Sequence, residues 1–421
     1  MFLQSYSPII WAVETFTTDY KAIGKIGEGT FSEVMKMQSL RDGNYYACKQ
    51  MKQRFESIEQ VNNLREIQAL RRLNPHPNIL TLHEVVFDRK SGSLALICEL
   101  MDMNIYELIR GRRYPLSEKK IMHYMYQLCK SLDHIHRNGI FHRDVKPENI
   151  LIKQDVLKLG DFGSCRSVYS KQPYTEYIST RWYRAPECLL TDGFYTYKMD
   201  LWSAGCVFYE IASLQPLFPG VNELDQISKI HDVIGTPAQK TLTKFKQSRA
   251  MNFDFPFKRG SGIPLLTTNL SPQCLSLLHA MVAYDPDERI AAHQALQHPY
   301  FQEQRLSTTK EGLEAVRKHD PETLCTRAAA HSGHRQPQKT DLKWKQFLWV
   351  SSGSTMLQSE PVAVHTALVD VHRLRSAGWH GSGAAGAPPH HSLESKSREA
   401  VRAAVGSLHY SSTWRTGLAW G

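Results

Sequence analysis

The sequence predicts an α+β protein with two lobes, a β-rich N-terminal lobe and a larger helical C-terminal lobe. Residues 20–98 contain mainly short runs of β-branched and aromatic residues separated by turn-forming glycines, as in antiparallel strands. One helix is expected there, at about 57–73, because its apolar residues recur every third position: Ile58, Val61, Leu64, Ile67 and Leu70. Helical periodicity prevails in 104–301. Ligands usually bind in the cleft between two such lobes.

Composition divides the chain into three parts. Apolar residues make up 42% and charged residues 22% of the 421 residues, so a sizeable core is expected. We assign 20–301 to one folded domain and 1–19 to an N-terminal extension without a clear pattern. In 302–421 the sequence is rich in Ser, Gly, Ala, His and Arg without sustained periodicity, which predicts a mostly disordered tail.

Charge, cysteine spacing and hydropathy argue against several classes of protein. The net charge of +10 is spread over the chain instead of forming a basic block, so no nucleic-acid partner is expected. The eight cysteines form no C-x-x-C pair, which argues against a zinc ribbon, and scattered thiols suit the reducing cytoplasm. No apolar run approaches the ~20 residues of a membrane span, so no span is expected.

Three features of the N-terminal lobe indicate a phosphate-binding site. The segment "IGKIGEGTFSEV" places Gly27 and Gly29 in a turn between two strands, where backbone N–H groups can cover a phosphate chain. Lys49 ends the next apolar strand, and Glu66 lies on the predicted helix. An ion pair between them would direct the ammonium group towards phosphate oxygens. Taken singly, these residues are more typical of an ordinary hairpin and of solvated charges.

The strongest signal lies in two turns bounded by apolar strands. "FHRDVKPENILI" contains Asp144 and Asn149, and "LKLGDFGSCR" contains Asp161. Carboxylate and amide oxygens of this kind suit Mg²⁺, which binds through one or two carboxylates together with substrate phosphates. Because both turns occur in this order downstream of the phosphate-binding features, a chance origin is improbable.

With these motifs, residues 20–301 resemble the eukaryotic protein kinase family. The resemblance implies an N-lobe at 20–98, a hinge at 99–103, a C-lobe at 104–301, and transfer of the ATP γ-phosphate with Mg²⁺ as cofactor. The catalytic residues that it implies are Asp144 as the base, Lys146, Lys49 and Glu66. The residues that it implies for ATP are Ile26, Gly27, Gly29, Val34, Ala47, Lys49, Leu151 and the backbones of Glu99 and Met101, with Asn149 and Asp161 for magnesium.

Two further implications concern the ATP site. Cys98 occupies the gatekeeper position before the hinge. Ser32 replaces the third glycine of the family's phosphate loop. Since serine can form the same turn, we expect activity to survive this departure.

The segment "TEYISTRWYRAPE" at 175–187 resembles the mitogen-activated and cyclin-dependent group. Members of that group phosphorylate Ser or Thr followed by Pro, so protein substrates with Ser/Thr-Pro sites are the implied partners. Arg184 matches the arginine that pairs with backbone near Ser179 and leaves a pocket for proline. "VIGTP" at 233–237 supports the same group, and Arg289 is the implied partner of Glu187.

The Thr-Glu-Tyr triplet implies regulation by phosphorylation, either by an upstream kinase or by autophosphorylation. Thr175 and Tyr177 match the regulatory sites of mitogen-activated kinases. The arginines implied to bind the two phosphates are Arg65, Arg143 and Arg166 for Thr175, and Arg181 and Arg184 for Tyr177. Resemblance to a branch with a basic C-terminal extension adds the nucleus and the cilium to the cytoplasm as expected locations.

Two other functions fit these residues less well than a protein kinase does. A catalytically silent scaffold with the kinase fold would usually have lost Lys49, Asp144 or Asp161, and all three are present. Kinases of small molecules lack the "WYRAPE" segment. His142 is expected to be a packed, hydrogen-bonded core residue and not a proton carrier.

Overall fold

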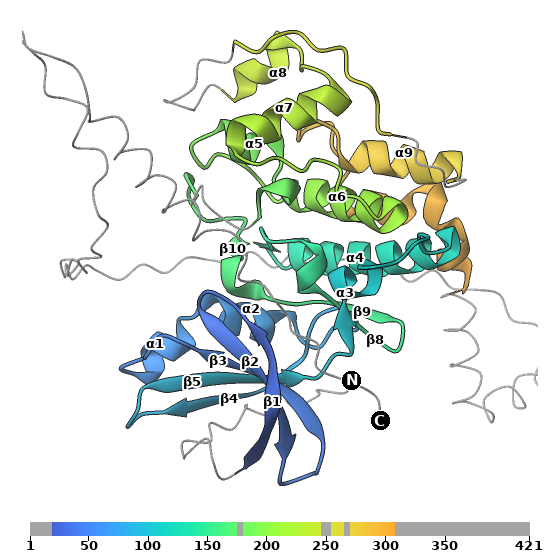
Figure 1. Cartoon of the computed structure of the whole chain (residues 1–421). Helices are drawn as coiled ribbons and strands as arrows, with labels where there is room; N and C mark the ends of the chain where they lie inside the picture. The colour runs from blue at the N-terminus through green and yellow to red at the C-terminus, as the bar shows by residue number, and fades with distance from the viewer. Residues whose placement is uncertain (1–18, 175–179, 246–253, 265–269, 308–421) are drawn as a thin grey trace, which may run out of the picture. The chain divides into compact units, whose positions relative to one another are not determined.

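The computed structural model describes residues 19–174, 180–245, 254–264 and 270–307, and it has the predicted two-lobed α+β fold (Figure 1). The N-lobe contains a five-stranded antiparallel sheet in the order β1-β2-β3-β5-β4. Its strands are β1 (Tyr20–Glu28), β2 (Ser32–Ser39), β3 (Tyr45–Met51), β4 (Leu82–Asp88) and β5 (Ser93–Glu99). Lys49 lies on the central strand β3, opposite Val34 of β2 and Leu96 of β5.

The prediction of one helix at 57–73 is wrong, because the structure has two helices there. They are α1 (Ile58–Asn62) and α2 (Arg65–Leu73), and Leu64 between them has an extended backbone with ψ of 125°. Two adjacent asparagines, which are poor helix formers, precede Leu64 and favour this break. The apolar period still crosses the break, since both helices bury their apolar residues in the same core.

The C-lobe is mainly helical, as predicted, and α4 and α6 pack along one another in it (Figure 1). The helices are α3 (Ile105–Ile109), α4 (Glu118–Arg137), α5 (Pro186–Leu190), α6 (Met199–Ser213), α7 (Glu223–Ile234), α8 (Gln239–Lys244), α9 (Pro272–Met281) and α10 (Ala292–Gln297). The short strands are β6 (Met103–Asn104), β8 (Ile150–Lys153) and β9 (Val156–Leu159) in one sheet, and β7 (Ile140–Phe141) with β10 (Arg166–Ser167) in another. The 3₁₀ helices are η1 (Pro147–Asn149), η2 (Phe162–Ser164), η3 (Arg181–Tyr183) and η4 (Pro299–Phe301).

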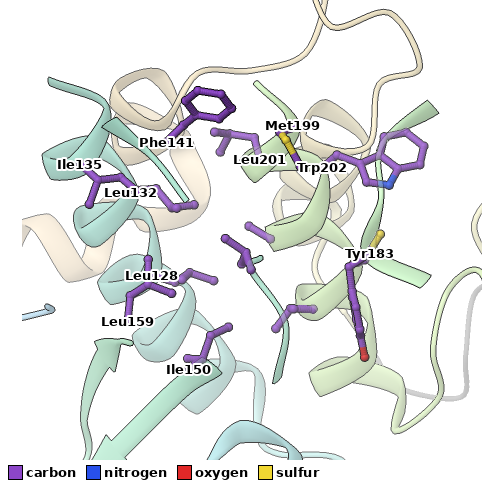
Figure 2. Packing of buried hydrophobic residues seen from close by; sticks show 14 of the residues in the cluster. Leu128, Leu132, Ile135, Phe141, Ile150, Leu159, Tyr183, Met199, Leu201 and Trp202 are labelled. Carbon is purple, nitrogen blue, oxygen red and sulfur yellow. The ribbon is translucent and has the colours of Figure 1, made fainter. Parts of the chain in front are cut away.

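The C-lobe core forms around α6, which is buried from Met199 to Ala212. Figure 2 shows Leu128 and Leu132 of α4 on one side and Trp202 of α6 on the other. A helix that is buried on all its faces belongs to the interior of a large core. It therefore gives the loops that pack on it a rigid support.

The predicted contact between Arg289 and Glu187 is confirmed. Two guanidinium nitrogens of Arg289 lie 2.6 and 2.9 Å from the two carboxylate oxygens of Glu187, in a bidentate arrangement. The Arg289 guanidinium also lies 5.2 Å from the centre of the Trp202 ring. Because Arg289 is 1% and Glu187 1% exposed, the pair joins α5 to the segment before α10 inside the core.

The structure continues past the predicted end of the domain at 301. Residues 302–307 are helical, and Arg305 Nη1 donates to the carbonyl oxygens of Leu296 and His298 at 2.8 and 2.9 Å. The predictions for 1–18 and 308–421 lie outside the described residues. No helix in the part of the chain that the structure describes is long and apolar enough to cross a membrane.

Candidate active site

Lys49 contacts carboxylates from both lobes. Its Nζ lies 2.6 Å from Oε1 and 2.8 Å from Oε2 of Glu66, so strand β3 and helix α2 are joined by the ion pair expected from the sequence. The same Nζ lies 2.9 Å from Oδ1 of Asp161, which precedes η2 in the C-lobe. One ammonium group therefore connects three elements of the site.

The charged groups of this cluster shift one another's pKa values. Burial alone would lower the pKa of Lys49, but Asp161 and Glu66 outweigh burial and raise that pKa above its ordinary value. Lys49 in turn holds the pKa of Asp161 well below its usual range, although burial opposes the effect. Burial raises the pKa of Glu66, against the charge of Lys49. Lys49 and Asp161 are therefore charged at neutral pH.

The predicted phosphate-covering turn connects β1 and β2. Gly27 lies opposite Val34 in the register of the two strands, and the Gly29 N–H donates to the Ser32 carbonyl oxygen at 2.7 Å. Ser32 thus closes the turn with its backbone, which is compatible with the loss of the third glycine. Phe31 at the tip is 77% exposed, so the turn projects into solvent.

The side chains expected to contact adenine come from both lobes. Ile26 of β1, Val34 of β2, Ala47 of β3 and Leu151 of β8 are each half-buried. A Cβ at Gly160 would lie 3.1 Å from Leu151 Cδ1, so this glycine gives Leu151 the room that it needs. Half-buried apolar side chains retain surface that a flat ring can cover.

The residues around the hinge leave backbone groups for a ligand. Cys98, the expected gatekeeper, is 5% exposed, and burial raises the pKa of its thiol to about 12. The Glu99 N–H donates to the Thr81 carbonyl oxygen at 3.1 Å. Within the described residues, the backbone N–H and C=O of Met101 have no hydrogen-bond partner.

Two lysines of the C-lobe, which were not predicted from the sequence, contact the hinge. Lys158 Nζ on β9 lies 2.6 Å from Glu99 Oε1, which also accepts from the Thr81 N–H at 2.7 Å. Lys153 Nζ on β8 donates to the Leu100 carbonyl oxygen at 3.0 Å. Burial alone would raise the pKa of Glu99, but the hydrogen bonds from Lys158 and Thr81 lower it. The hinge is therefore fixed to the C-lobe by charged contacts.

Asp144 lies in the turn between β7 and η1, and its two carboxylate oxygens have different surroundings. Oδ2 lies 3.0 Å from Asn149 Nδ2 and 3.1 Å from Lys146 Nζ. Oδ1 is buried and has no hydrogen-bond partner among the described residues. A buried carboxylate oxygen without a partner is unfavourable. Asn149 uses its amide nitrogen here, which leaves its carbonyl oxygen for a cation.

Asp200, at the start of α6, anchors this turn. Its carboxylate accepts the backbone N–H groups of His142 and Arg143, each at 2.8 Å, and lies 2.8 Å from His136 Nε2. Burial alone would raise the pKa of Asp200, but His136 and these hydrogen bonds keep it lowered. This role of Asp200 was not predicted from the sequence, because its partners are distant in sequence.

His142 is a packed core residue, as expected. Its Nε2 lies 2.9 Å from the Gly160 carbonyl oxygen, and its Nδ1 accepts from the Asp144 N–H at 3.2 Å. The ring also packs edge-on against Phe162. Since both ring nitrogens are engaged with backbone, His142 joins the two turns that bear Asp144 and Asp161.

The arginines expected to bind the phosphate on Thr175 lie near one another. Arg143 Nε donates to the Ser164 carbonyl oxygen at 2.6 Å. The pKa of Arg166 is lowered to about 10, first by burial and then by the charges of Arg143 and Arg65. Arg143 and Arg65 therefore both lie close enough to Arg166 for their positive charges to act on it.

The remaining regulatory residues belong to the segment at 175–184. Thr175, Tyr177 and the backbone near Ser179 lie outside the described residues. Arg181 Nη1 donates to the Val221 carbonyl oxygen at 3.2 Å. Arg184, which is 5% exposed, lies 3.2 Å from Glu223 Oε1.

These residues, on this fold, have the arrangement of a phosphotransferase site, and comparison with known proteins defines the class. The protein kinase domain model matches residues 20–301. The chain belongs to the protein kinase family. Its predicted membership of that family is confirmed, and the fold agrees with it.

Individual relatives indicate a narrower group within this family. The chain is 96% identical to MAPK/MAK/MRK overlapping kinase from Homo sapiens over 300 residues, which are 71% of each protein. It is 82% identical to the Mus musculus protein of that name over 348 residues, 82% of this chain and 83% of the relative. It is 42% identical to serine/threonine-protein kinase ICK from Rattus norvegicus over 285 residues, 67% of this chain and 45% of the relative. The chain is thus a serine/threonine protein kinase of the mitogen-activated and cyclin-dependent group.

Replacing Asp144 by Asn should lower the single-turnover rate of phosphoryl transfer by at least about 10²-fold, because the carboxylate that accepts the proton is lost. ATP binding should change little, since Asp144 lies in the catalytic turn and not among the residues expected to contact adenine. Asp161→Asn is the control, and it should weaken Mg²⁺–ATP binding. An Asp144→Asn variant with most of the wild-type rate would contradict this role.

Replacing Lys158 by Met should raise KM for ATP by about tenfold with a smaller effect on kcat, since a charged hydrogen bond worth about 1.5 kcal/mol at the hinge is lost. The matched control is Lys258→Met. Lys258 Nζ lies 2.7 Å from Asp232 Oδ1, and this ion pair is not at the hinge. Steady-state kinetics and thermal unfolding should be measured on both variants. Equal KM values for the two variants would show that the hinge contact does not position ATP.

Proposed function

We propose that this kinase is proline-directed and transfers the ATP γ-phosphate to Ser or Thr of proteins, under the control of Thr175 and Tyr177 phosphorylation. The observation that supports transfer most strongly is the carboxylate of Asp144, held beside Lys146 and Asn149. We also propose Mg²⁺ as cofactor, since Asn149 and Asp161 supply an amide and a carboxylate oxygen. Cytoplasm, with nucleus and cilium, is the proposed location.

The chain's own residues account for each part of the reaction. Lys49 orients the α and β phosphates, and Glu66 holds Lys49 in place through two contacts below 3 Å. The carboxylate of Asp144 accepts the proton of the substrate hydroxyl. Lys146 Nζ offsets the charge that develops on the transferred group. Bound Mg²⁺ would neutralise phosphate charge at Asn149 and Asp161.

Arg184 supports the preference for proline. It is almost fully buried, directly before Ala185 and Pro186 at the start of α5, and lies 3.2 Å from Glu223. A buried arginine in the segment that follows the activation triplet can occupy nearby backbone carbonyl groups. A substrate residue with its own N–H would then leave that donor unsatisfied, whereas proline has no N–H to satisfy.

Peptides in which proline follows the phosphoacceptor should be preferred at least tenfold in kcat/KM over peptides with alanine there, or about 1.4 kcal/mol. A positional peptide array followed by kinetics on the two peptides measures this. Since both peptides share every other residue, the ratio reports that position alone. Equal kcat/KM for proline and alanine would refute the proline-directed reading while leaving kinase activity established.

The arginine cluster supports control by phosphorylation. Arg65 begins α2, Arg143 precedes Asp144, and Arg166 lies on β10, so a phosphate bound by all three would connect both lobes. After burial, the positive charges of Arg143 and Arg65 contribute to the lowered pKa of Arg166, and a dianion would offset these charges. Phosphate on Tyr177 would instead face Arg181 and Arg184 on the peptide-binding side. The activating enzyme is either an upstream kinase or this chain itself.

Phosphatase treatment and Thr175→Ala should each lower kcat by at least about tenfold, whereas Tyr177→Phe should mainly raise KM for peptide. The comparison uses untreated, phosphatase-treated and variant proteins, with the phosphorylation state of each read by mass spectrometry. The same kcat in phosphorylated and unphosphorylated protein would show that Asp144 and Asp161 are already in place without modification.

A further inference from the structure

A cavity of about 410 Å³ lies in the C-lobe between α3 and the end of α6. Its lining includes three arginines from the segment after α3, namely Arg110, Arg112 and Arg113. All three are exposed. The proposed reaction gives none of them a role.

These guanidinium groups are held by uncharged contacts. Arg110 lies with its guanidinium 5.8 Å from the centre of the Tyr106 ring, and Arg112 Nε donates to the Leu108 carbonyl oxygen at 2.7 Å. In the part of the chain that the structure describes, no carboxylate lies within ion-pair distance of Arg110, Arg112 or Arg113. Three positive charges on one cavity are therefore not neutralised by ion pairs within the described residues.

The acidic residue that lines the same cavity offsets this charge only in part. Glu210 is 7% exposed, and its Oε2 accepts a hydrogen bond from the Tyr183 hydroxyl at 2.8 Å. Burial raises the pKa of Glu210 to about 7, so a substantial fraction of this carboxyl is uncharged at neutral pH. The cavity keeps an excess of positive charge.

The cavity borders elements that adjoin the catalytic turn and the proposed proline pocket. Helix α3 packs against η1, which directly follows Lys146 of the catalytic turn. Tyr183, the partner of Glu210, lies on η3, immediately before Arg184 of the proposed proline pocket. The elements that line the cavity are therefore in contact with η1 and η3, which adjoin Lys146 and Arg184 in the chain.

We propose that this cavity binds a phosphorylated Ser or Thr of the protein substrate, near the residue to be phosphorylated, through the guanidinium groups of Arg110, Arg112 and Arg113. The inference rests on the proposed transfer to protein Ser or Thr. A phosphate fits better than a carboxylate, since it is close to a dianion and offers three acceptor oxygens to forked donors. The kinase would then prefer substrates that another kinase has already modified.

The test compares phosphorylation of matched peptides by the full-length protein. One phosphoserine is placed in turn at each position on either side of the acceptor, in a Ser-Pro and in a Ser-Ala peptide, and kcat/KM is divided by that of the unmodified peptide. We expect a gain of about tenfold at one position or two neighbouring positions, a smaller gain with Glu there, and a decline of the gain with added salt.

Two variants locate the effect. In Arg110→Gln/Arg112→Gln/Arg113→Gln the ratio should fall to about one, whereas in Arg89→Gln/Lys90→Gln, at the exposed turn after β4, it should stay near the wild-type value. If the triple variant fails to fold, Arg113→Gln alone should lower the ratio. Each ratio compares kcat/KM for two peptides with the same enzyme variant. A general loss of activity would therefore leave the ratio unchanged.

Two results would overturn the proposal: no position with a gain in the wild-type protein, or a gain that survives the triple variant. Failure of the proposed function is distinguishable from either. In that case the unmodified peptides would not be phosphorylated at all, or proline and alanine peptides would be used equally while the gain from phosphoserine remained.

Discussion

The ammonium group of Lys49 is the contact on which the arrangement of the active site depends. It lies within 2.9 Å of carboxylate oxygens from Glu66 on α2 and from Asp161 before η2. Two carboxylates that lie close together in a partly buried site are tolerated only because a cation lies between them. The position of α2, and therefore of Arg65 at its first residue, is thereby coupled to the turn that bears Asp161. In the proposed reaction the ATP phosphates contact the same ammonium group, so they would compete with Asp161 for it.

A second set of contacts gives the catalytic turn a fixed base. Asp200 accepts two backbone N–H groups of that turn from the start of the buried helix α6. His142 then links the turn to Gly160, directly before Asp161. Asp144 is thus held by the C-lobe core, whereas Lys49 is held by the N-lobe sheet. Movement of one lobe on the other would change the distance between the phosphate contacts and the base, which is consistent with control through the arginine cluster.

The sequence was sufficient to predict the parts of the site that consist of contiguous motifs. Asp144, Lys146 and Asn149 lie within six positions, and the Lys49–Glu66 contact follows from one strand and one helix with clear apolar patterns. The break before Arg65 was missed because the apolar period continues across it. Lys158 was missed because its partner Glu99 is 59 positions away, and a lysine that alternates with leucines in a strand is usually solvated. The cavity at Arg110 was missed for a similar reason, since α3 and the end of α6 meet only in the fold.

A double-mutant cycle on Lys49→Met and Glu66→Gln, read by single-turnover phosphoryl transfer at saturating ATP, tests the role of Lys49 most directly. If Glu66 acts by holding Lys49, each single variant slows transfer, and adding Glu66→Gln to Lys49→Met causes little further loss. Unfolding of all four proteins should be followed to separate rate from stability. If the fold-decrease in rate of the double variant equals the product of the fold-decreases of the two single variants, Glu66 and Lys49 act independently. That result would contradict this account.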